Sequence, residues 1–152
     1  MTLNVLAPLP GTVVALEEVP DPVFSGAIVG PGLALDPHRE GEVEVIAPIS
    51  GTIVKFHPHA FVIVGADGHG VLVHLGLDTV QLGGAGFMLH AAEKDTVEAG
   101  QLLVTWSPQE IEDGGRNPIS PIVALDGMAQ ALTLSVQPGD VVSAGDPLFD
   151  WA

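Results

Sequence analysis

The chain has 152 residues, 47% of them apolar and 15% charged, which is enough to bury a hydrophobic core, so we expect one domain spanning residues 1–152. Nineteen acidic residues against four basic ones give a formal net charge of −15, which would repel phosphate backbones and anionic lipids, so binding to nucleic acids or membrane surfaces is not expected. The sequence has no cysteine, no basic leader and no apolar run of membrane-spanning length, which excludes disulfides and predicts a cytoplasmic protein without membrane insertion.

Two related motifs, each present twice, run along the chain. VLAPLPGTVVAL at 5–16 matches VIAPISGTIVKF at 45–56, and DTVEAGQLLVTW at 95–106 matches DVVSAGDPLFDW at 140–151. The offsets are 40 and 45 residues, and two copies are too few for a solenoid. We therefore expect two β-motifs, each used twice, in one antiparallel assembly.

The segment HAFVIVGADGHGVLVHLGLD at 59–78 predicts an antiparallel hairpin, because two β-prone apolar runs flank the turn-like GADGHG. His59 near the start of the first strand and His74 near the end of the second would face each other across the ladder. Directly opposed residues lie about 4.5–5.5 Å apart at Cβ, so the two imidazoles could share one small ligand. A single histidine on an apolar strand is more often a packing residue, so the prediction depends on the pair.

The rest of the chain reads as short strands and turns, with no sustained 3.6-residue apolar period. The best helix candidate begins at Ser107 or Pro108, continues through QEIED and ends at Gly114. With the repeats, this pattern predicts an all-β fold: an antiparallel β-sandwich or barrel with internal pseudo-repeats and at most short helical turns. The remaining histidines are interpreted as exposed loop or edge residues, and both tryptophans as core packing: His38, His69, His90, Trp106 and Trp151.

The run HAFVIVGADGHGVLVHLGLDTVQLGGAGF resembles the signature region of the glucose-type IIA components of the bacterial sugar phosphotransferase system. The similarity extends to VFSGAIVGPGLALDP, APISGTIVKF and SPIVALDGM, so it covers nearly the whole chain. The resemblance implies an enzyme, a phosphotransferase component that carries a phosphoryl group on histidine. Such a component accepts the group from the phosphocarrier protein HPr and passes it to a IIB domain of a sugar permease, and it can also bind regulatory protein targets.

Residue by residue, the resemblance makes His74 the phosphoryl acceptor and His59 the imidazole that stabilises the phosphate. His57 stands where the family usually has a hydroxyl residue, so a third imidazole would replace that hydrogen-bond donor. The resemblance also implies a docking surface for the partners, with carboxylates that face their arginines and apolar residues between them: Asp78, Asp126, Phe24, Leu72 and Leu75. No cofactor is required by this reading, although His59 and His74 could also bind zinc.

Two other interpretations stay open. His57, His59, His74 and Asp78 resemble, in a different order, the zinc ligands of cell-wall peptidases built from similar β-motifs. The V-x-x-G-D patterns also resemble biotinyl and lipoyl carrier domains, which attach their cofactor to a hairpin lysine. The only lysines, at positions 55 and 94, do not lie in a tight hairpin between the repeats, which weakens the second interpretation.

Overall fold

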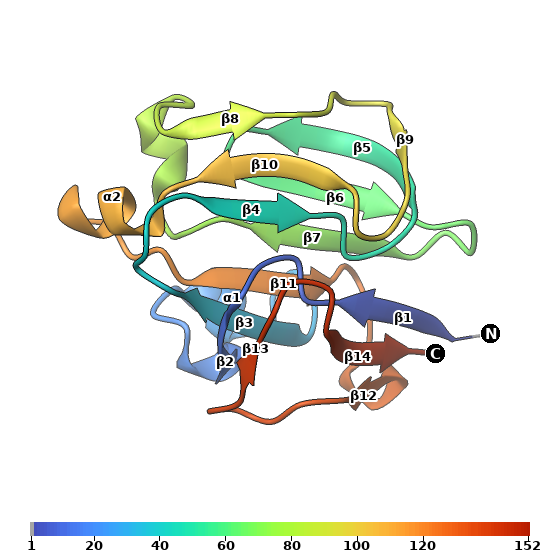
Figure 1. The fold of residues 1–152 in the computed structure, drawn as a ribbon. Helices are drawn as coiled ribbons and strands as arrows, with labels where there is room; N and C mark the ends of the chain where they lie inside the picture. Colours follow the sequence, from blue (N-terminus) through green and yellow to red (C-terminus); the bar gives the residue numbers. More distant parts are fainter. Residues whose placement is uncertain (1) are drawn as a thin grey trace.

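The computed structural model describes residues 2–152 and consists mainly of antiparallel sheets. One sheet has eight strands in the order β13-β2-β3-β11-β7-β6-β5-β9, and two sheets have three strands each, in the orders β1-β14-β12 and β4-β10-β8. Figure 1 shows β4, β10 and β8 lying across the part of the large sheet that contains β5, β6 and β7. The predicted all-β antiparallel fold is confirmed, as sandwich-like sheets rather than a closed barrel.

The elements have the following bounds. The large sheet contains β2 (Gly11–Ala15), β3 (Gly32–Pro37), β5 (Gly51–His57), β6 (Ala60–Val64), β7 (Gly70–His74), β9 (Thr96–Val97), β11 (Ser120–Ala124) and β13 (Val141–Val142). The smaller sheets contain β1 (Leu3–Leu6), β12 (Leu132–Leu134) and β14 (Pro147–Trp151), and β4 (Val43–Ile46), β8 (Phe87–Leu89) and β10 (Leu102–Trp106). Helical segments are short: α1 (Pro22–Ser25), α2 (Pro108–Asp113) and the 3-10 turns η1 (Leu16–Glu18), η2 (Thr79–Leu82) and η3 (Ala129–Ala131).

The repeated motifs are related by an approximate twofold symmetry. The backbone N–H of Leu6 donates to Pro48 O (3.0 Å), and the equivalent N–H of Ile46 donates to Pro8 O (2.8 Å). The second motifs hydrogen-bond to the first ones in the same symmetric way, through Gly100 N to Ala47 O (2.9 Å) and Gly145 N to Ala7 O (2.8 Å). The predicted internal duplication is therefore visible in the backbone hydrogen bonds.

Helix α2 begins and ends as the sequence predicts. Ser107 is its N-cap and accepts from the backbone N–H of Glu110, and Gly114 follows its last turn. Helix α1 was not predicted, because four residues are too few to show an apolar period. It begins at Asp21, whose side chain accepts from Val23 N (3.0 Å), with proline in its first turn.

The two faces of β7 contact different apolar clusters. Val71 and Val73 point into the main core, which also holds the fully buried Trp106 and the nearly buried Trp151, as predicted for both tryptophans. Leu72 belongs with Phe24 to a smaller cluster on the outer face of the sheet. Because side chains alternate along a strand, the residue two positions after Leu72 also lies on the outer face.

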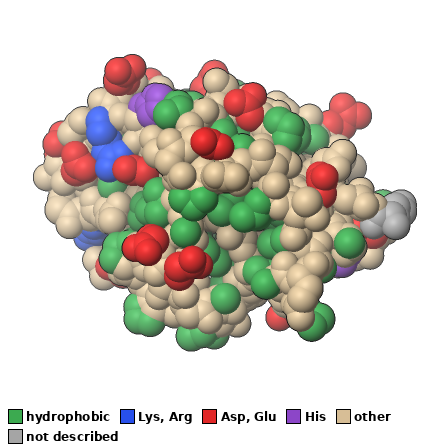
Figure 2. Space-filling model, turned by 90° about the horizontal axis from the view of Figure 1, so that it is seen from below, with side chains coloured by type: hydrophobic (Ala, Val, Ile, Leu, Met, Phe, Trp, Pro, Cys, Tyr) green, Lys and Arg blue, Asp and Glu red, His purple; other side chains and the backbone are tan. Residues whose placement is uncertain are grey.

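Acidic side chains far outnumber basic ones among the charged residues, 19 against 4. On the face seen from below, hydrophobic side chains gather in the middle, Asp and Glu stand around them, and Lys and Arg lie at one end (Figure 2). This distribution agrees with the net charge of −15. Within residues 2–152, no helix is both long enough and apolar enough to cross a membrane.

Candidate functional site

His74 is the last residue of β7, and its ring is held in one orientation. Nδ1 lies 2.6 Å from the carbonyl oxygen of Gly76, a distance at which the Nδ1–H donates to that oxygen. Phe24 packs against the ring, with 5.2 Å between ring centroids. The hydrogen bond fixes the tautomer, so the lone pair of the neutral ring is on Nε2.

The loop that supplies this carbonyl is rigidly built. Gly76 has φ +80°, and a Cβ there would lie 2.7 Å from Cγ2 of Thr79. Thr79 is buried, and its hydroxyl donates to Leu75 O (2.7 Å). The next backbone N–H, that of Leu77, donates to Asn117 O (2.8 Å). Glycine is therefore needed at this position, both for its left-handed conformation and for the lack of space.

His59 lies in the turn between β5 and β6, and the prediction that it is a strand residue directly opposite His74 was wrong by one position. Ala60 is the residue paired with His74, and a two-residue turn of Pro58 and His59 joins β5 to β6. The carbonyl oxygen of His59 accepts from the backbone N–H of Leu75 (2.7 Å), so His59 lies one step beyond the Ala60–His74 pair. The two imidazoles nevertheless meet, with ring centroids 5.2 Å apart and ring planes at 74°.

Burial controls the ionisation of both rings. It lowers the pKa of His74 below the ordinary 6.5 and outweighs the Gly76 hydrogen bond and the carboxylates of Asp21 and Asp78, which act in the opposite direction. Burial is also the largest cause of the lowered pKa of His59, followed by the charges of the neighbouring histidines. Both rings are therefore neutral at pH 7, the form in which an imidazole nitrogen is a nucleophile.

Two carboxylates lie close enough to influence His74, and only one of them was predicted. Asp78 is exposed and follows the Gly76 loop, as the sequence suggested. Asp21, the N-cap of α1, was missed. Its signal in the sequence is the Asp-Pro pair that typically opens a helix, placed three residues before Phe24.

The predicted apolar docking residues occupy three different environments. Leu72 is half-buried on the outer face, where a partner can contact it. Phe24 is only 6% exposed, because its ring packs in the smaller apolar cluster and against the ring of His74. Leu75 is fully buried in the main core, and the prediction that it contributes to the surface was wrong, because it continues the inward alternation of Val71 and Val73.

Asp126 does not lie beside the histidines. The backbone N–H of its neighbour Leu125 donates to Gly70 O at the far end of β7. Since a strand rises about 3.3 Å per residue, this end is about 13 Å from His74. Asp126 can therefore influence only a partner that covers the whole outer face.

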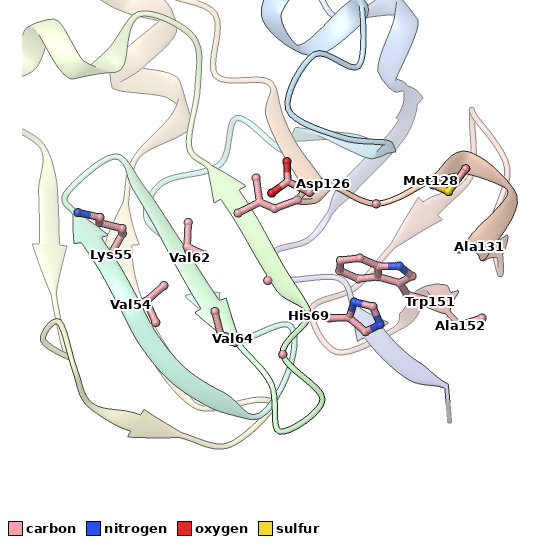
Figure 3. Close-up of a pocket in the computed structure, with 14 residues that line it drawn as sticks. Val54, Lys55, Val62, Val64, His69, Asp126, Met128, Ala131, Trp151 and Ala152 are labelled. Carbon is pink, nitrogen blue, oxygen red and sulfur yellow. The ribbon is translucent and has the colours of Figure 1, made fainter.

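A hollow of about 700 Å³ occupies that far end (Figure 3). Its walls carry valine side chains of β5 and β6, with Lys55 and Asp126 among the polar groups. His69 lies in the loop directly before β7, as expected, but it is half-buried rather than exposed, because its ring packs on Trp151 with 3.9 Å between ring centroids. The half-buried histidine pair does not line this hollow.

The ligands for a metal are incomplete around the histidines. In the part of the chain that the structure describes, no group of three or more His, Cys, Asp or Glu side chains could hold a metal ion. Tetrahedral zinc takes four ligands, of which His59 and His74 would supply two. Zinc binding at this pair remains a prediction, and it would need further ligands from water or a partner.

Comparison with known proteins gives consistent matches. The family model described as "phosphoenolpyruvate-dependent sugar phosphotransferase system, EIIA 1" matches residues 3–130. Glucose-specific EIIA components from Bacillus cereus and Bacillus anthracis are each 43% identical over 122 residues, which cover 79% of this chain and 72% of the relative. The structure of the glucose permease IIA from Mycoplasma capricolum matches with a TM-score of 0.86 and 35% identity, and the match covers 99% of this chain and 96% of the other.

Proposed function

The chain belongs to the EIIA 1 family of the phosphoenolpyruvate-dependent sugar phosphotransferase system, and we propose that it accepts a phosphoryl group on His74 from HPr and passes it to the IIB domain of a sugar permease. The observation that carries this assignment is the 2.6 Å contact between Nδ1 of His74 and Gly76 O. It leaves Nε2 as the nucleophile on an exposed face that a partner can cover.

The transfer itself is an in-line displacement at phosphorus. The lone pair on Nε2 of His74 forms the new N–P bond, while the N–P bond of the donor phosphohistidine breaks and its electrons return to the donor nitrogen. The Nδ1–H stays on His74, and Gly76 O stabilises the positive charge that develops on the ring. No proton has to cross the interface if the donor ring also keeps its own N–H.

His59 supports the phosphoryl group in this proposal. Its neutral ring, edge-on to His74, can donate one N–H to a phosphoryl oxygen. The surrounding carboxylates repel free phosphate, whereas Asp21 and Asp78 attract a partner that presents arginines around its own histidine. Asp126 would contribute to the same attraction from the far end of the outer face.

The relay would work in the cytoplasm, a reducing compartment where proteins rarely form disulfides, and this chain has no cysteine. The relatives named glucose-specific make glucose the first sugar to test. The phosphorylated and free forms differ in charge on this face, so regulatory proteins that distinguish the two forms are further partners in the proposal.

The test is to incubate the protein with phosphoenolpyruvate, the first enzyme of the system and HPr, and to measure intact mass. We expect one acid-labile phosphoryl group, absent in His74→Ala and present in His59→Gln, which should transfer it onward more slowly. His90→Ala is the matched control, because His90 is exposed and bonded to Thr105 away from the site. An adduct that persists in His74→Ala, or no adduct in the native protein, would overturn the proposal.

A further inference from the structure

A row of side chains crosses three strands of the outer face at the site. In the pairing of β5, β6 and β7, His57 is opposite Ala60, and Ala60 is opposite His74. Opposed residues share one face of a sheet, and adjacent strands are about 4.8 Å apart, so the backbones of the two histidines are about 9.6 Å apart. The middle position carries only a methyl group, which leaves a gap between two imidazoles.

The ring of His59 lies between the other two imidazoles. From the turn beside Ala60, it stacks on His57 with centroids 5.9 Å apart and planes at 24°, and it meets His74 edge-on at 5.2 Å. Both separations are in the range of favourable aromatic contacts. His57 therefore contacts the supporting histidine rather than the proposed phosphoryl acceptor.

The ring of His59 has few other constraints. His74 is fixed by the Gly76 hydrogen bond and by Phe24, but within the described residues no hydrogen bond to the His59 ring is found. The second side-chain torsion of histidine has broad minima, so packing must set the angle of the ring. The planar ring of His57 is the neighbour that lies parallel to it.

We propose that His57 is a positioning residue, whose ring holds His59 in the edge-on orientation beside His74. This inference rests on the proposed phosphoryl transfer and differs from the role expected from the sequence, where His57 replaces a hydroxyl donor. At two strand spacings from His74, His57 acts through His59. Its side chain therefore acts through the planar ring that stacks on His59, and this role does not require a hydrogen-bonding group.

Three substitutions of His57 distinguish a role of its aromatic plane from a role of its hydrogen-bonding groups. His57→Phe keeps an aromatic plane without N–H groups, His57→Thr supplies a hydroxyl without a plane, and His57→Ala removes both. In single-turnover transfer from phosphorylated HPr, the saturating rate of the Ala and Thr variants is expected to fall about tenfold or more, and that of the Phe variant to stay within about threefold. The apparent KM for HPr should be unchanged in all three, since positioning acts after docking.

The outcomes distinguish this inference from the function on which it rests. If the Phe variant is as slow as the Ala variant, or if the Thr variant is as fast as the native protein, a polar group matters and the inference is wrong. A rise in the apparent KM for HPr without a change in the saturating rate would make His57 a docking contact and would likewise overturn the inference. A native protein that takes up no phosphoryl group would instead contradict the proposed function.

An NMR measurement gives a second readout independent of transfer. The nuclear Overhauser effect between the rings of His59 and His74 should be retained in His57→Phe and lost in His57→Ala. Thermal unfolding checks the fold of each variant, and little change is expected because His57 is exposed. A nuclear Overhauser effect between the two rings that is unchanged in His57→Ala would also overturn the inference.

Discussion

Replacing Gly76 with alanine is expected to impair both the stability of the protein and the orientation of His74. Gly76 has φ +80°, a conformation that L-residues rarely adopt. The added methyl group would lie 2.7 Å from Cγ2 of Thr79 and 3.1 Å from Asn117 O. The Gly76 carbonyl, which holds Nδ1 of His74, moves with any relaxation of this loop.

The magnitude follows from two separate costs. The left-handed conformation costs about 1–2 kcal/mol for a residue with a Cβ. Overpacking against a buried neighbour adds about 1–3 kcal/mol. Thr79 cannot turn away freely, because its hydroxyl is bonded to Leu75 O. The free energy of unfolding should therefore fall by about 2–5 kcal/mol in Gly76→Ala.

Gly68→Ala is the matched control, because Gly68 has φ +85° with no atom within 4 Å of the added Cβ. Its cost should be the conformational part alone, about 1–2 kcal/mol. Thr79→Ser combined with Gly76→Ala removes the clashing methyl group, keeps the hydroxyl and should recover part of the lost stability. Urea unfolding measures the stabilities, and single-turnover phosphorylation measures the orientation of His74. Equal losses in Gly76→Ala and Gly68→Ala, or a normal phosphorylation rate in Gly76→Ala, would refute this reasoning.

Thr79→Val should lower the free energy of unfolding by about 1–3 kcal/mol in urea unfolding, because it leaves Leu75 O without its donor; an unchanged value would mean that water replaces the hydroxyl. Asp21→Asn keeps a capping side chain but removes the charge, so the pKa of His74 followed by NMR should fall further, and association with HPr should slow. An unchanged pKa would place the carboxylate too far from the ring. Folding lowers the pKa of His59 and His74, so the unfolded chain binds more protons than the folded chain once the pH falls below about 6.5. The free energy of unfolding should therefore decrease from that pH down to the folded pKa values and then level off. In His74→Gln the decrease should be smaller, and an identical pH dependence would assign it to other groups.

The repeats and the hairpin could be predicted from the sequence, because glycine, proline and β-branched runs are local signals. The motif copies form symmetric hydrogen bonds, and the predicted turn between β6 and β7 is where the structure has it. Helix α2 was also predictable, since Ser107 and Gly114 are typical end signals.

The exact register at the site could not be predicted, because it depends on a turn. In the β6–β7 hairpin the loop at 65–69 pairs Val64 with Gly70, and this register places Ala60 rather than His59 opposite His74. The burial of Leu75 could have been predicted, because this residue continues the inward alternation of Val71 and Val73, whereas the family resemblance placed it on the docking surface.

The carboxylates near the site show the limit of reasoning from single segments. Asp78 lies four residues from His74 in the sequence and was found, whereas Asp21 reaches the same ring from a different part of the chain. Asp126 was grouped with the site but belongs to the other end of β7. Which distant residues meet is decided by sheet order, and the sequence contains no local signal for that order.

The central claim is that Nε2 of His74 receives the phosphoryl group while Nδ1 keeps its proton on Gly76 O. Two-dimensional nitrogen and phosphorus NMR of the phosphorylated protein, with labelled histidine, tests it most directly. We predict a single phosphorus signal coupled to Nε2 of His74, with Nδ1 still protonated. Coupling to Nδ1 of His74, or to either nitrogen of His59, would contradict the account.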